Sequence, residues 1–159
     1  MGWKRVQAAA TELMVQLPPI PDPWLIEDLC ARVAARRGRP LLLHSMDLPA
    51  LPFGFWLDDG VRDHIIYRSG VAGFHRDHII LHELCHMLAG HNATGEDGQS
   101  HAGVDIDRLI ERAMTNRFND RQEDVAEMFA SRVLKVVHDG FPGSLSDFEQ
   151  HAAAMFGAA

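Results

Sequence analysis

Apolar residues recur at spacings of three and four along much of the chain, which is the pattern of amphipathic helices. The first such stretch covers residues 3–16 and ends before a pair of prolines. The second reaches Arg37, with Asp22 expected as its N-cap and Pro23 as its first helical residue. Gly38 is expected to end it. The first quarter of the chain is therefore predicted to be helical.

Between residues 40 and 68 the pattern changes to short apolar runs separated by turn residues, which predicts a small β-sheet. The expected strands are residues 40–44, 53–57 and 61–68. The sequence Asp58-Asp59-Gly60 is typical of a hairpin turn and is expected to join the last two strands.

Helical spacing then returns and continues to the end of the sequence. A mostly apolar helix is predicted from Gly73 to residue 89, followed by Gly90 and a polar, glycine-rich loop over residues 91–103. The remaining predicted helices are residues 104–114, residues 121–138 behind a cap at Asn119-Asp120, and residues 144–156. The elements together predict a compact, mostly helical α+β fold, a single domain over residues 1–159 with its core in 20–138.

Composition narrows the class of protein. The chain has 159 residues, 47% of them hydrophobic, and a net charge of −7, which argues against nucleic-acid binding through a basic face. We find no signal peptide and no apolar run of membrane-spanning length. Cys30 and Cys85 are too few for a disulfide framework, so we expect a reducing, cytoplasmic location without a membrane partner.

The apolar helix contains the sequence His82-Glu83-Leu84-Cys85-His86. Two histidines four residues apart lie on one helical face, where both can bind one metal ion. Glu83 is placed to take a proton from a water molecule on that ion. The alternative is a core helix with two hydrogen-bonded histidines. Burying three ionisable groups among apolar neighbours favours a metal, because such groups need partners.

A hydrolytic zinc site takes three protein ligands, so one ligand must come from elsewhere in the chain. Glu123 and Glu127 share one face of the predicted helix 121–138. We predict that Glu123 is the third ligand and that Glu127 accepts the second ring N–H of a ligating histidine. The alternative for Glu123 is a capping box with Asp120, and for Glu127 it is a pair with Arg132 or Arg121, or plain solvation.

Other histidines compete for a role in this site. His78 extends the histidine stripe backwards, but it lies eight residues before His86, or about 12 Å along a helix axis, too far to share one ion. We place His78 at the rim of the site. The three other nearby histidines are expected on the surface: His75, His91 and His101.

The motif and the helix that follows it resemble the ImmA/IrrE family of bacterial metallopeptidases. The resemblance rests on the His-Glu-x-x-His sequence and on the run from Glu123 to Ala130, and it extends over residues 20–135. This chain departs from the family in three places: Cys85 replaces a glycine, Val125 replaces the second glutamate, and Glu127 replaces an asparagine.

The resemblance implies a zincin fold, Zn²⁺ as cofactor and a gluzincin-like third ligand, Glu123. It also implies a helix-turn-helix repressor as the protein partner and substrate, in stress responses or in the control of phages and mobile elements. Either Tyr67 or His78 is expected to help stabilise the oxyanion. The strand from Val61 to Tyr67 is expected to pair with an extended substrate. We predict a zinc endopeptidase with Glu83 as the base. The alternative is a non-cleaving zinc-binding regulatory or toxin–antitoxin module.

Overall fold

A computed structural model describes residues 2–47, 54–91, 107–108, 110–111 and 118–139 of the chain. The predicted helix at residues 144–156 lies outside these residues, as do most of the predicted helix 104–114 and the predicted loop after residue 91. The described part is an α+β structure, as expected. None of its helices has a stretch long and apolar enough to cross a membrane.

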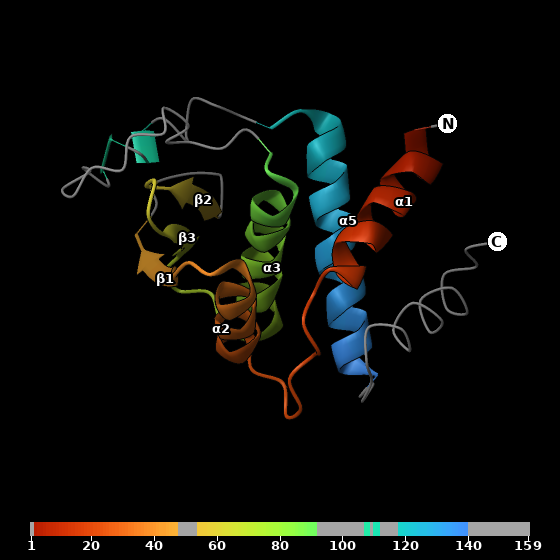
Figure 1. The fold of residues 1–159 in the computed structure, drawn as a ribbon, viewed down its shortest axis with the longest axis horizontal. Coiled ribbons are helices and arrows are strands. Elements are labelled where there is room, and N and C mark those ends of the chain that lie inside the picture. The colour runs from red at the N-terminus through yellow and green to blue at the C-terminus, as the bar shows by residue number, and fades with distance from the viewer. Residues whose placement is uncertain (1, 48–53, 92–106, 109, 112–117, 140–159) are drawn as a thin grey trace.

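Helix α3, Gly73–Ala89, lies at the centre of the fold (Figure 1). The sheet packs on one side of it and helix α5, Asp120–His138, on the other. Helix α1, Gly2–Val15, covers α5. The predicted bounds of α3 are confirmed, and those of α1 and α5 are confirmed to within one residue at each end.

Helix α3 is held in place by burial of both of its sides. Ile80, Leu81, Leu84 and Cys85 are completely inaccessible to solvent and belong to one apolar cluster with α1 and α5. Each such aliphatic side chain contributes about 1.5–3 kcal/mol on burial, so the helix is anchored along its length. The polar residues of α3 that face the interior are therefore fixed in position by the apolar residues around them.

Helix α2, Ile26–Arg37, starts three residues later than predicted. The expected cap at Asp22 is wrong, because the first helical hydrogen bonds run from the N–H groups of Asp28 and Leu29 to the carbonyl of Leu25. Leu25 is extended, with φ −146° and ψ 121°. The preceding Trp24 is instead tied to α3, since its Nε1–H donates to Asp77 at 2.8 Å.

Three strands form the sheet: β1, Leu41–Met46; β2, Gly54–Asp58; and β3, Asp63–Arg68. Their order is β1-β3-β2, so β3 is the central strand, parallel to β1 and antiparallel to β2. The predicted hairpin between β2 and β3 is confirmed, but its turn is longer than expected. Val61 and Arg62 are not in the strand, because their backbone N–H groups donate to the Asp59 carboxylate at 2.8 and 2.6 Å.

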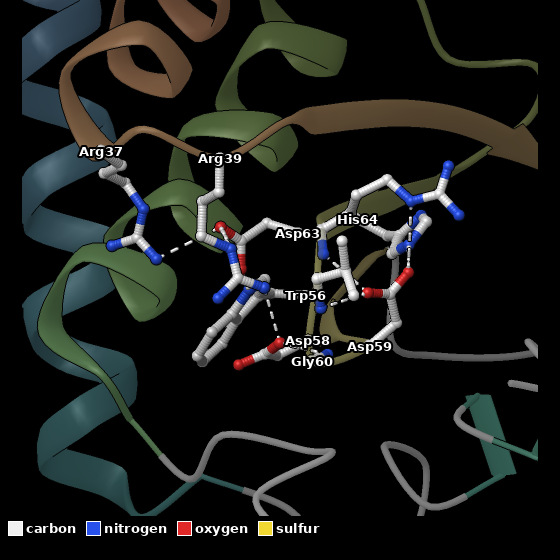
Figure 2. Close-up of polar contacts among 10 residues, drawn as sticks. Arg37, Arg39, Trp56, Asp58, Asp59, Gly60, Asp63 and His64 are labelled. Atoms are coloured by element: carbon white, nitrogen blue, oxygen red, sulfur yellow. Dashed lines mark hydrogen bonds and ion pairs between the residues drawn. The ribbon is translucent and has the colours of Figure 1, made fainter. Parts of the chain in front are cut away.

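Carboxylates fix the start of β3 (Figure 2). Asp63, only 1% exposed, accepts from Trp56 at 3.1 Å and from Arg37 at 3.2 Å. It also forms an ion pair with Arg39, which joins the end of α2 to the sheet. A buried carboxylate needs such partners, because an unpaired one would cost several kcal/mol. The sheet is thereby held at a fixed position beside α2.

Candidate metal centre

Helix α3 presents two imidazoles on one face. His82 and His86 are one helical turn apart, and their Nε2 atoms are 3.2 Å from each other. His86 is completely buried, whereas the side chain of His82 is 16% exposed. One imidazole is therefore enclosed by the fold and the other lies at the mouth of the site.

Helix α5 brings a carboxylate to the same two nitrogens. Glu123 places one oxygen 3.1 Å from His82 Nε2 and the other 3.1 Å from His86 Nε2. The alternative capping role of Glu123 is wrong, because the capping box is formed by Asn119 and Gln122. The cap fixes the first turn of α5 and leaves the Glu123 carboxylate available for the histidines.

The three side chains fit a tetrahedral transition metal. The two Nε2 atoms are 3.2 Å apart, and each of them is 3.1 Å from a different oxygen of Glu123. Ligands on a tetrahedral zinc ion, with bonds of about 2.0–2.1 Å, are separated by about 3.3 Å. His82, His86 and Glu123 each offer one such atom within 4.8 Å of the other two. Two imidazoles and one carboxylate are also ligand types that zinc accepts, so the donor set and its spacing agree.

In the metal-free site, His82, His86 and Glu123 shift one another's pKa values. Burial alone would raise the pKa of Glu123, but hydrogen bonds from both histidines outweigh it and lower that pKa to about 2. Burial acts to lower the pKa of His82, and the neighbouring carboxylates, Glu123 first, raise it overall. The pKa of His86 is lowered, chiefly by burial. Glu123 is thus an anion at neutral pH, as a metal ligand must be.

Glu83 lies beside the ligands and is 6% exposed. Burial is the main cause that raises the pKa of Glu83 to about 7, with Glu123 acting in the same direction. The charge of His82 and the backbone N–H of Trp56 on β2 act the other way. Its Oε2 atom has no hydrogen-bond partner in the described part of the chain. A buried carboxyl with a free oxygen and a pKa near neutrality has the properties of a general base.

Glu127 lies one turn beyond Glu123 and touches two histidines. One of its oxygens is 3.2 Å from His82 Nδ1 and the other is 2.9 Å from His78 Nε2. The alternative pairing of Glu127 with Arg132 is wrong, since Arg132 bonds to α1 at Gln7 and Thr11. These contacts agree with the expected role of Glu127 as acceptor for His82.

His78 is held at the rim of the site by this contact. His78, His82 and Glu127 could also surround an ion. That group would use Nδ1 of His82, not the Nε2 atom that contacts Glu123. Glu127 is 60% exposed whereas His86 is completely buried, so we assign the metal to the more enclosed group, with His78 as a partner of Glu127.

Two predictions about substrate binding and catalysis involve residues of β3. The strand from Val61 to Tyr67 was expected to pair with an extended substrate, and this is wrong, because β3 is hydrogen-bonded on both sides by β1 and β2. The ring of Tyr67 lies 5.0 Å from the guanidinium of Arg76. Its oxyanion role stays a prediction, as does that of His78.

Strand β2 approaches the motif helix closely at Gly54. A Cβ atom at Gly54 would lie 2.8 Å from the Ile79 side chain and 3.4 Å from that of Glu83. Only glycine permits this approach, because an added methyl group would collide with α3. Among the described strands β2 is one edge of the sheet, so its outer side is the candidate for pairing with an extended peptide.

Sequence reasoning missed one residue of the site. His91, expected on the surface, has its Nδ1 atom 3.0 Å from Nδ1 of the buried His86. Burial, reinforced by His86, lowers the pKa of His91 to about 4, so it is neutral at physiological pH. Phe118, just before α5, stacks on His86 with ring centroids 3.6 Å apart and an interplanar angle of 9°.

Comparisons with protein-family models, with curated proteins and with solved structures gave no match for this chain. The functional argument therefore rests on the residues of the chain and their geometry.

Proposed function

We propose that this protein is a zinc-dependent endopeptidase with a zincin-like fold. The observation that carries the proposal is the convergence of His82 Nε2, His86 Nε2 and Glu123 at 3.1–3.2 Å. The buried Glu83 beside them, with one unsatisfied oxygen, supplies the base that hydrolysis needs. A purely structural zinc site is closed by a fourth protein ligand, and the candidate group found among the described residues has three.

The residues divide the work between binding and proton transfer. His82, His86 and Glu123 would hold Zn²⁺, which when bound acts as a Lewis acid on a carbonyl and lowers the pKa of water. Glu83, buried beside the ligands with one free oxygen, would take up a proton from the attacking water and deliver it to the leaving amine. Glu127 accepts the Nδ1–H of His82 and orients that ring.

The substrate proposed is a helix-turn-helix repressor, bound as an extended segment along the edge of β2. Two arguments support it: the resemblance of the motif and of the Glu123 helix to ImmA/IrrE peptidases, and the position of β2 against Glu83. An added strand is held by main-chain hydrogen bonds, so its sequence can vary while its backbone stays in register with the site.

The test is cleavage by wild type and by Glu83→Gln, each loaded with one equivalent of zinc. Both proteins are incubated with a purified helix-turn-helix repressor and, separately, with a peptide mixture from a proteome digest. New N-termini are identified by mass spectrometry. Wild type is expected to cut, and Glu83→Gln to keep its zinc while losing activity by about 10²-fold or more.

Cleavage at the wild-type rate by Glu83→Gln would rule out Glu83 as the base. Zinc-loaded wild type that binds the repressor and cuts neither substrate would instead support the non-cleaving regulatory module.

A further inference from the structure

The end of helix α3 turns the chain back onto its own last turn. Gly90, directly after the helix, has φ 69° and ψ 29°, a left-handed conformation that favours glycine. The N–H of His91 then donates to the carbonyl of His86 at 3.0 Å, and the N–H of Gly90 donates to that of Met87 at 3.2 Å. These two bonds define a Schellman motif, which brings the second residue after the helix against the residue five positions earlier.

In a Schellman motif this contact is frequently between two apolar side chains, but here it joins two imidazoles. His91 Nδ1 is 3.0 Å from His86 Nδ1. His86 is completely buried, and its ring plane is fixed by the stacked Phe118. The other nitrogen of the ring, Nε2, is the one that faces Glu123 and His82.

The two nitrogens of His86 therefore have different tasks. A neutral imidazole has one N–H and one lone pair, and a hydrogen bond to one nitrogen decides which nitrogen carries the proton. If Nδ1 of His86 donates its proton to His91, Nε2 has its lone pair free. We infer that His91 is a positioning residue that accepts the Nδ1–H of His86 and so keeps His86 Nε2 available for a metal ion. This inference rests on the proposed metal centre.

His91 is not itself a ligand of the same ion. It contacts the ring nitrogen of His86 that faces away from Glu123, and no candidate ligand group of the described residues includes it. It is therefore expected to act through His86 alone.

With this inference, both histidine ligands have a hydrogen-bond acceptor at Nδ1. The two proposed ligands from α3 each have an outer acceptor at Nδ1: Glu127 for His82 at 3.2 Å, and His91 for His86 at 3.0 Å. The first acceptor is the exposed carboxylate of Glu127 on α5, and the second is the imidazole of His91 beside the buried ligand. Loss of an outer partner of this kind typically costs 10–100-fold in metal affinity.

The experiment compares the zinc affinity of wild type, His91→Phe and His91→Asn by competition with a chromophoric chelator. Phenylalanine keeps a flat ring but has no acceptor, whereas the Oδ1 atom of asparagine lies about where Nδ1 of histidine does. His75→Phe, at the exposed start of α3, is the matched control for loss of a histidine. Urea unfolding of the metal-free proteins measures any general loss of stability.

His91→Phe is expected to bind zinc roughly 10–100-fold more weakly than wild type, while His91→Asn and His75→Phe stay within about threefold. Wild-type affinity in His91→Phe would overturn the role of His91 and leave the metal centre intact. An equal loss in His91→Asn would also overturn it, because the acceptor is retained there. Failure of wild type to bind zinc would overturn the metal centre and the inference together.

Discussion

Two groups of histidines and carboxylates in the described part of the chain differ in their geometry, and the one between α3 and α5 is arranged for a metal. In the centre between α3 and α5, the Nε2 atoms of His82 and His86 are 3.2 Å apart, and each oxygen of Glu123 is 3.1 Å from one of them, so the three side chains converge. In the sheet, Asp59, His64 and His44 form a chain instead.

The geometry of this sheet chain excludes a shared ion. His64 Nε2 is 2.7 Å from Asp59, while its Nδ1 is 2.9 Å from Nε2 of His44, so the middle residue uses its two nitrogens on two different partners. No candidate ligand group among the described residues includes Asp59, His64 or His44. The same residue types thus give a structural network in one place and a ligand set in the other, depending on whether their atoms converge.

The comparison is tested most strongly by removing metal. Zinc at about a thousandfold its Kd is expected to stabilise the wild-type fold by about 4 kcal/mol over the chelator-treated protein. The reason is that His82, His86 and Glu123 converge only in the folded state. Urea unfolding with and without zinc measures the difference. His82→Phe should lose this stabilisation, and an undiminished effect there would place zinc elsewhere.

Disrupting the hydrogen-bonded chain in the sheet should lower the stability of the fold without changing its zinc affinity. His64→Phe is expected to lower the free energy of unfolding by about 2–3 kcal/mol, because it leaves buried Asp59 and half-buried His44 without their partner. Zinc affinity should be unchanged. The measurement is urea unfolding combined with chelator competition, with His75→Phe as the control. A change in zinc affinity beyond about threefold would mean that the two groups are coupled.

The smallest expected effect is a dependence on pH in the sheet chain. Burial would raise the pKa of Asp59, but hydrogen bonds from His64 and from the N–H groups of Arg62 and Val61 lower it to about 2. A carboxyl whose folded pKa is depressed stabilises the fold above its unfolded value of about 3.9, and this is lost as pH falls towards 2.

Asp59→Asn should therefore be less stable than wild type by about 2 kcal/mol at pH 6, with the difference narrowing between pH 4 and pH 3. Denaturant unfolding across this range measures it. A difference that stays constant with pH would show that the carboxylate charge is not what matters.

The centre of the site was predictable because its signals are local. Four-residue spacing puts His82 and His86 on one face of α3, and the same spacing put Glu123 and Glu127 on one face of α5. The apolar residues of α3 and α5 pack into one buried cluster, and this packing brings the histidines of α3 next to the glutamates of α5.

What could not be predicted depends on longer-range packing or on turn geometry. The central place of β3 results from a parallel pairing with β1, which no spacing in the sequence indicates. The role of His91 had a signal that was available: Gly90 ends α3 in a left-handed conformation, and such an end places the next residue against His86. A glycine after a motif helix therefore locates a further residue of the site.

The central claim, that His82, His86 and Glu123 are one metal centre, is tested most directly by zinc binding in Glu123→Gln. This substitution preserves the shape of the side chain and removes its charge. Wild type is expected to bind one zinc ion per chain. Glu123→Gln is expected to bind zinc more than about a hundredfold more weakly, a larger loss than removal of a hydrogen-bond partner of a ligand typically causes. Equal zinc affinity in the two proteins would contradict the claim.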